Sequence, residues 1–233
     1  MRYLFVFIYF SCFSFAQSIG GLATYSFLPK NNDEIENLLK EDDPYELNKK
    51  MLEASTKLEV KLMFNVNRSC FYVENPEKDS GIKLASALYL NITGKTFTDL
   101  NRKKLLFNNS EGFFKKNKYV VTDSLHTNWI LTNDTKQIDN YKCYKATLTH
   151  SVKSRKGNVT AWYCPEIPYS FGPKGYGGLP GLIVELIDKR GVIGLKTLSL
   201  NVPIDEKVLD IKGEEEISSE EYQKLVEKLI FDE

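Results

Sequence analysis

The stretch PEIPYSFGPKGYGGLPG, from Pro165 to Gly181, decides the fold expected for this chain. It carries half of the eight prolines and more than a third of the fourteen glycines in the sequence. Proline fixes φ and lacks an amide hydrogen, whereas glycine reaches backbone angles that other residues avoid. Neither a helix nor a regular strand tolerates that mixture. We therefore expect a specified, irregular loop that leads into the apolar strand Leu182–Ile187.

Strand patterns flank this loop on both sides. Lys153–Asn158 is a charged segment that ends in Gly-Asn, which is typical of a hairpin turn, and Asp188–Gly191 forms a second turn after the loop. The strands joined by these turns are expected at Tyr141–His150, Val159–Cys164, Leu182–Ile187 and Val192–Leu200. The loop therefore lies between two hairpins.

The middle of the chain alternates as strands do. Residues 58–74 predict either one long strand or two strands broken near Asn67–Ser69, and Asn133-Asp134 indicates a turn. Further strands are expected at Lys104–Asn108, Gly112–Lys116, Lys118–Asp123 and Asn128–Leu131.

Apolar residues at three- and four-residue spacing predict helices elsewhere. That spacing runs over residues 32–57 and recurs at Gly81–Asn91, where a strand is the alternative. A last helix follows the acidic tail. Its capping candidates are Ser218 or Ser219 with Glu220 or Glu221.

These patterns predict an α+β fold built on a single curved antiparallel sheet of roughly seven to nine strands, with flanking helices. Residues 17–30 are expected to be a short extended lead within a helical N-terminal segment, 17–57. Residues 58–233 are expected to form one sheet domain with the C-terminal helix.

The amino terminus is typical of a secretory signal peptide. Arg2 precedes the continuously apolar Leu4–Phe10, and Ser14-Phe15-Ala16 offers small residues at the cleavage positions. We expect a signal peptide over 1–16, cleavage after Ala16, no transmembrane segment in the mature chain, and a periplasmic or secreted location. A retained membrane anchor is the alternative. Lys+Arg and Asp+Glu both number 31, so the net charge of zero gives no reason to expect a nucleic-acid partner.

Export changes the interpretation of the cysteines. Removal of Cys12 with the signal peptide leaves Cys70, Cys143 and Cys164, and an oxidising compartment permits one disulfide among them. Cys143 and Cys164 flank a predicted hairpin and are the preferred pair. A fully reduced set of buried thiols is the alternative.

The standard catalytic and metal-binding patterns are absent from the sequence. GPKGYGG has no Ser or Thr after its lysine, and Pro180 stands where a dinucleotide fingerprint needs glycine. With two histidines and no C-x-x-C or H-E-x-x-H run, no metal site is expected. A Cys164–His150 pair or a Glu166–Glu185 pair could do chemistry, but structural roles are favoured. We predict no catalytic residue and no cofactor.

Aromatic residues gather in and around the loop. Such residues line pockets for apolar ligands and anchor protein partners. The alternative is that they close the open end of the sheet and are buried there. The candidate ligand- or partner-binding residues are Trp129, Trp162, Tyr163, Glu166, Tyr169, Phe171, Tyr176 and Leu179.

The same region resembles a known family. The motifs concerned are Ile138–Ala146, Thr160–Tyr163, Glu166–Pro168, Gly172-Pro173 and the run GLPGLI at Gly178–Ile183. In these motifs the chain is similar to the GLPGLI (Porph_ging-type) family of exported Bacteroidetes proteins, and it departs from the family pattern at Asn140 and Cys164. The resemblance implies export but no established activity. It also implies a layout similar to periplasmic lipoprotein carriers, whose half-open barrel holds acyl chains.

The functional expectation is a non-enzymatic, exported cell-envelope protein that binds an apolar ligand or an envelope partner. One alternative is an accessory component of an outer-membrane uptake system, with the GLPG loop as its docking surface. A less favoured alternative is an exported hydrolase. A hollow under the sheet would favour ligand carriage, whereas a filled core would favour docking.

Overall fold

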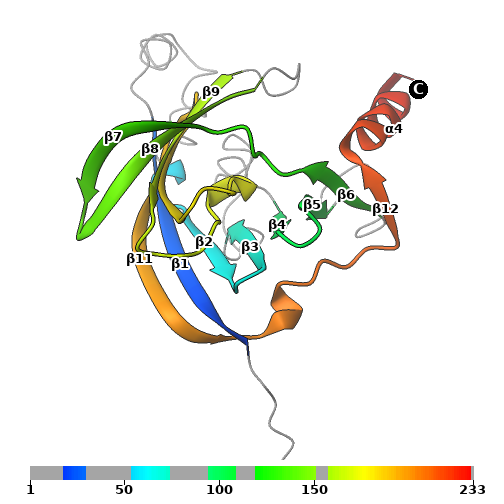
Figure 1. The fold of residues 1–233 in the computed structure, drawn as a ribbon. Coiled ribbons are helices and arrows are strands. Elements are labelled where there is room, and N and C mark those ends of the chain that lie inside the picture. Colours follow the sequence, from blue (N-terminus) through cyan, green and yellow to red (C-terminus); the bar gives the residue numbers. More distant parts are fainter. Residues whose placement is uncertain (1–17, 30–53, 74–93, 109–118, 151–156, 232–233) are drawn as a thin grey trace, which may run out of the picture.

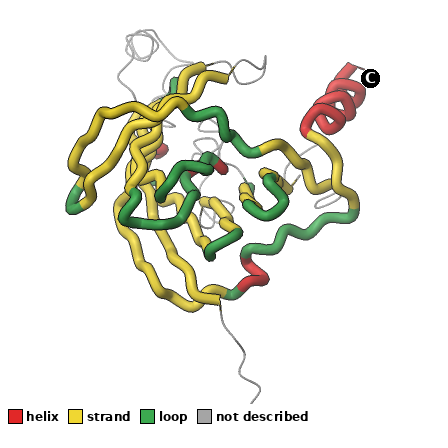
Figure 2. The backbone as a smooth tube through the Cα atoms, in the orientation of Figure 1, coloured by secondary structure: helices red, strands yellow, loops and turns green. Residues whose placement is uncertain are grey.

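The computed structural model describes residues 18–29, 54–73, 94–108, 119–150 and 157–231, and these form one large sheet (Figures 1 and 2). The sheet has twelve strands and is antiparallel except where β12 runs parallel to β6. The strands are β1 (Ser18–Pro29), β2 (Glu59–Phe64), β3 (Arg68–Val73), β4 (Lys95–Asp99), β5 (Lys104–Asn108), β6 (Tyr119–Ser124), β7 (Ile130–Ile138), β8 (Tyr141–His150), β9 (Gly157–Cys164), β10 (Leu182–Ile187), β11 (Gly191–Ile204) and β12 (Glu215–Ser218). The helices are the 3₁₀ turns η2 (Pro173–Gly175) and η3 (Glu206–Val208), and α4 (Ser219–Phe231).

The strand order forces the sheet to curl. The order is β12-β6-β5-β4-β3-β2-β1-β11-β10-β9-β8-β7, so β6 and β7 lie near opposite ends. In a flat sheet, strands ten positions apart would be about 48 Å apart at roughly 4.8 Å per strand. Residues 125–129 nevertheless join β6 to β7, and a segment that short reaches only about 20 Å. The sheet therefore bends round into an open curve, as Figure 1 shows.

The two faces of the curved sheet carry separate cores. On β2, Val60, Leu62 and Phe64 are buried in the main core. Met63, which points to the opposite face, packs instead against a second cluster. That cluster consists of Cys70, Phe97, Leu106, Val120, Ile204 and Leu209. Because Ile204 and Leu209 belong to it, the stretch between β11 and β12 covers the outer face of β3–β6.

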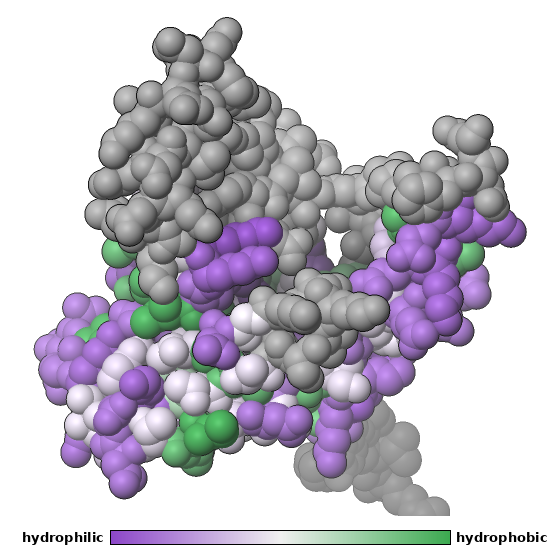
Figure 3. All heavy atoms as spheres, turned by 90° about the horizontal axis from the view of Figure 1, so that it is seen from above, coloured by the Kyte–Doolittle hydropathy of each residue, from purple (hydrophilic) through white to green (hydrophobic). Residues whose placement is uncertain are grey.

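The described surface carries no large apolar patch. The exposed large hydrophobic side chains are scattered over β1, β7, β11 and the β2–β3 turn. They are Ile19, Leu28, Val66, Ile130, Leu131 and Leu200. In the view of Figure 3 the hydrophobic residues likewise form small patches among hydrophilic ones. Single exposed apolar residues of this kind are normal for a folded protein.

The expected single curved sheet is confirmed, but the fold is mostly β rather than α+β. Residues 18–29 of the expected extended lead are extended, but they form a strand of the sheet: β1 lies between β2 and β11 and buries Ala23, Tyr25 and Phe27. The strands Lys95–Asp99 and Glu215–Ser218 were not expected. The turn at Asn133-Asp134 is also wrong, since β7 runs through it with a bulge.

Other expectations are confirmed or remain outside the described residues. Residues 58–74 form two strands, and Ser218 caps α4 in a box with Glu221, whose amide donates to the serine hydroxyl at 3.2 Å. The ranges 1–17, 30–53, 74–93, 109–118 and 151–156 are not described. The signal peptide, most of the N-terminal helical pattern, Gly81–Asn91 and Gly112–Lys116 therefore stay predictions.

Candidate functional site

The loop Pro165–Gly181 lies inside the curve of the sheet, at the centre of Figure 1. Its first half runs beside β10, where the amide of Leu182 donates to the carbonyl of Ile167 and that of Ile183 to Phe171, at 3.0 and 2.9 Å. The bonds between β10 and β11 begin only at Glu185. The loop therefore occupies the space where these two strands separate.

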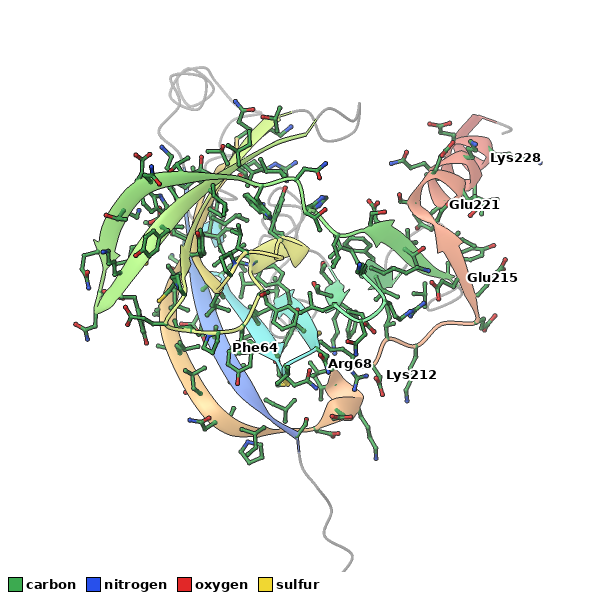
Figure 4. The ribbon with its side chains drawn as sticks, viewed as in Figure 1. Phe64, Arg68, Lys212, Glu215, Glu221 and Lys228 are labelled. Carbon is green, nitrogen blue, oxygen red and sulfur yellow. The ribbon has the colours of Figure 1, made fainter. Side chains whose placement is uncertain are left out.

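Buried side chains of the loop fill the concave side. Phe171 and Leu179 are 0% and 1% exposed. The ring of Phe64, labelled in Figure 4, lies 4.7 Å from that of Tyr169 and 6.2 Å from that of Phe171, centroid to centroid. Because Phe64 comes from β2 and the loop from the β9–β10 connection, these contacts join the two walls of the sheet.

An enclosed ion pair fixes the middle of the loop. The Lys174 ammonium lies 2.8 Å from the Asp188 carboxylate, and the two side chains are 11% and 18% exposed. Asp188 also accepts hydrogen bonds from the amides of Arg190 and Gly191. Burial lowers the pKa of Lys174, whereas the pKa of Asp188 is lowered because Lys174 and these amides outweigh its own burial. The pair ties η2 to the β10–β11 turn.

The connection between β6 and β7 is fastened to the same loop. The indole Nε1 of Trp129 donates to the carbonyl of Gly177 at 2.9 Å. Tyr176 lies between the rings of Trp129 and His126, with centroid distances of 6.0 and 5.0 Å. Seven of the eight predicted residues, all but Glu166, belong to the main core or pack against it. Five of these lie in the loop or contact it, namely Trp129, Tyr169, Phe171, Tyr176 and Leu179.

We expect Trp129→Phe to lower the free energy of unfolding by about 1–2 kcal/mol, because the Gly177 carbonyl loses its partner. Urea unfolding followed by far-ultraviolet circular dichroism measures the loss. The matched control is Trp162→Phe on β9, whose partly buried ring packs against the same core and lies under the Lys136 ammonium at 4.6 Å. Equal losses in both variants would argue against a specific role for the Trp129 bond.

Tyr163 and Glu166 line a surface pocket of about 240 Å³ at the root of the loop, which we call the tyrosine pocket. Its other lining residues are Lys142, Tyr144 and Pro165. The rings of Tyr144 and Tyr163 lie 6.1 Å apart, and the Lys142 ammonium lies 5.6 Å from the Tyr144 ring. Burial raises the pKa of Tyr163. The ammonium of Lys142 and the carboxylate of Glu166 thus lie at the edge of a pocket whose walls include two tyrosine rings.

Trp162 and Glu185 lie on the other side of the same strands. They are register partners, and Lys136 both contacts the Trp162 ring and bonds to Glu185 at 2.6 Å. Successive residues of a strand point to opposite faces, so Trp162 and Tyr163 do not share one. Glu185 is therefore separated by the sheet from the pocket that Glu166 lines, and the two carboxylates form no acid–base pair.

A second pocket, of about 440 Å³, was not predicted from the sequence. It lies between β3–β5 and the stretch before β12, near Arg68 and Lys212 in Figure 4. Arg68 bonds to Asp210 and, at 3.1 Å, to Glu206, and Arg102 bonds to Glu216 at 2.6 Å. These ion pairs join residues 114 to 142 positions apart in the sequence, a spacing that no local pattern reveals. These pairs hold the β11–β12 stretch against the sheet.

The described residues contain no group of His, Cys, Asp and Glu side chains suited to a metal. Within them, no helix is long and apolar enough to cross a membrane. In the structure Cys70, Cys143 and Cys164 are buried, free thiols, so the preferred Cys143–Cys164 disulfide is not formed in it.

Comparison with known proteins finds a match to a family model and a likeness to solved structures. The model of Porph_ging, a protein family of unknown function, matches residues 153–185, which confirms the expected resemblance. No curated protein matches the sequence. Two solved structures of PNGF-II, in the P21 and C2 space groups, are each 14% identical with a TM-score of 0.56 and cover 91% of this chain. The chain spans only about a third of the PNGF-II chain, 34% and 33% respectively, so the likeness shows a shared fold over that part.

Proposed function

We propose that this chain is an exported, non-catalytic binding module that docks onto a protein of the cell envelope through the tyrosine pocket. The observation that carries the proposal is the position of the loop. Phe171 and Leu179 fill the concave side of the sheet, where a carrier of the half-open-barrel kind would hold an apolar ligand. Where the described residues fill the concave side, a ligand or partner has to bind at the surface.

The tyrosine pocket has the chemistry of an anchor site for one side chain. Tyr144 is half-buried and supplies the ring face open to a partner, and Tyr163, 6% exposed, packs behind it. Aromatic residues dominate the energies of protein interfaces. Lys142 and Glu166 balance each other in charge at its edge. The pocket therefore suits a flat side chain that carries a neutral hydrogen-bonding group, such as tyrosine or tryptophan, from a partner.

The wider comparison agrees with a module that works beside other structures. The same fold spans about a third of the PNGF-II chain, so it occurs there as part of a longer polypeptide. A more specific form of the proposal is an accessory role at an outer-membrane uptake system. An exported hydrolase is disfavoured because Glu166 and Glu185 lie on different faces of the sheet.

A photo-crosslinker placed at residue 144 tests the docking step in cells that make the protein. We expect one discrete adduct, identified by mass spectrometry, that disappears when Glu166→Lys reverses a charge at the pocket edge. The matched control is Glu227→Lys on the exposed face of α4, which should leave the adduct intact. An adduct that survives both substitutions, or none at all in the parent protein, would contradict docking through this pocket.

Two further measurements test the other parts of the proposal. Amino-terminal sequencing of the mature protein should begin at Gln17, and a retained Met1 would contradict signal-peptide cleavage. Solvent extraction of the purified protein should release no stoichiometric lipid. A lipid found at one equivalent would restore the carrier interpretation.

A further inference from the structure

Two of the three buried thiols lie on neighbouring strands at the root of the loop. In the β8–β9 ladder, Tyr144 is paired with Tyr163 in antiparallel register. The paired positions end at Tyr144 and Tyr163, and Cys143 and Cys164, the last residue of β9, come one step further along the two strands. The thiol of Cys164 also acts on the pKa of Cys143, as expected of a close neighbour. Both cysteines are 0% exposed and belong to the same core cluster. The register thus brings together two residues that are 21 positions apart in the sequence.

Directly opposite residues of antiparallel strands have the spacing that a disulfide requires. Their side chains share one face, and their Cα atoms lie about 4.5–5.5 Å apart. The Cα atoms of disulfide-linked cysteines usually lie about 4.4–6.8 Å apart. Cys70 has no such neighbour, because its register partners on β2 and β4 are Met63 and Phe97. Among the described cysteines, geometry therefore selects one pair.

The surroundings of these thiols indicate when they can react. Burial raises the pKa of Cys143 to about 11, and the neighbouring Cys164 contributes to this rise. Burial also raises the pKa of Cys164, against hydrogen bonds from the amides of Glu166 and Ile167. The thiolate is the reactive form, so the folded protein keeps both groups protonated and shielded from oxidants. The two thiols are therefore expected to be oxidised while the chain is still folding, before the core shields them.

We propose that Cys143 and Cys164 are a cross-linking site that becomes a cross-strand disulfide during folding in an oxidising compartment. The oxidant is a protein or small-molecule disulfide. One thiolate attacks it to give a mixed disulfide, and the second thiolate displaces the oxidant's remaining thiol, so that two protein thiols lose two electrons and two protons while the oxidant is reduced to two thiols. The bond fixes the start of the loop to β8, next to Tyr144 and the tyrosine pocket. The claim that this disulfide forms in the cell rests on the proposed export.

Oxidative refolding of the purified chain tests the chemistry independently of export. The chain is denatured, reduced and refolded in a glutathione redox buffer, then digested with trypsin without reduction. We expect peptides 143–145 and 157–174 to appear as one linked species and peptide 69–78 to carry a free thiol. The linked protein should unfold about 5–10 °C higher than the reduced one, because the bond closes a loop of some twenty residues.

Matched variants separate this pair from non-specific oxidation. Cys70→Ala should leave the linked peptide and the thermal shift unchanged, whereas Cys143→Ala should abolish both. Adding the same buffer to the native, reduced protein should give at least tenfold slower cross-linking than refolding does. Three free thiols after refolding, or a link that includes Cys70, would overturn the proposal. Failure of signal-peptide cleavage with a correct link in vitro would instead count against the proposed export.

Discussion

Gly181→Ala should lower the free energy of unfolding by at least about 3 kcal/mol, or prevent folding at 37 °C altogether. Gly181 ends the loop with φ +149°, in the range that disfavours residues with a Cβ. A Cβ built there would lie 2.1 Å from the carbonyl oxygen of Cys164, which is backbone and has little room to move. The added methyl group would therefore push the end of the loop away from β9.

Gly157→Ala is the control for this prediction, because it isolates the backbone contribution. Gly157 has nearly the same φ, +150°, but a Cβ there would meet nothing within 4 Å. It should lose only about 1–2 kcal/mol, the usual cost of an unfavourable backbone conformation. Urea unfolding followed by circular dichroism compares the two variants, and the soluble yield replaces it where Gly181→Ala does not fold. Equal losses would show that the contact with Cys164 is unimportant.

The strands beside the loop could be predicted because local signals bound them. Leu182–Ile187 is a short apolar run between Gly181 and the turn at Asp188, and the structure has a strand with the same bounds. In β1, the spacing of Ala23, Tyr25 and Phe27 alternates as in a buried strand. This strand was not predicted, because Gly20-Gly21 and Pro29 near its two ends are typical of loops. The sequence predicts only the first part of β7, because Asn133-Asp134 indicate a turn. In the structure a bulge absorbs these two residues and the strand continues.

The sequence could not predict which aromatic residues pack with the loop and which line the tyrosine pocket, since this depends on contacts between distant strands. Phe64 meets Tyr169 and Phe171 only because the sheet curls. Likewise, Tyr163 rather than Trp162 lines the pocket, because the β8–β9–β10 register places the two residues on opposite faces of the sheet. Composition indicated that aromatics matter in this region, and the register decides which of them pack against the loop and which line the tyrosine pocket.

The buried pair of Lys174 and Asp188 gives the second large expected effect. Lys174→Met should lower the free energy of unfolding by about 2–4 kcal/mol, because it leaves a mostly buried carboxylate without its cation. Methionine keeps an unbranched side chain, so the positive φ of 56° at this position is strained no more than before. The double variant Lys174→Met, Asp188→Leu should recover much of that loss, since apolar replacements of buried ion pairs are often close to neutral.

The dependence of stability on pH distinguishes an ionic contribution from packing. The pKa of Asp188 is lowered on folding, so its contribution is present above the ordinary aspartate pKa and is lost as pH falls through the folded value. Between about pH 6 and pH 3, the parent protein should therefore lose more stability than the double variant, which has no carboxyl group at this position. Urea titrations at both pH values measure this difference. If the two proteins lose equal stability on acidification, the pair holds η2 by packing. Lys174→Met, whose side chain is similar in volume to that of lysine, should then cost little stability by itself.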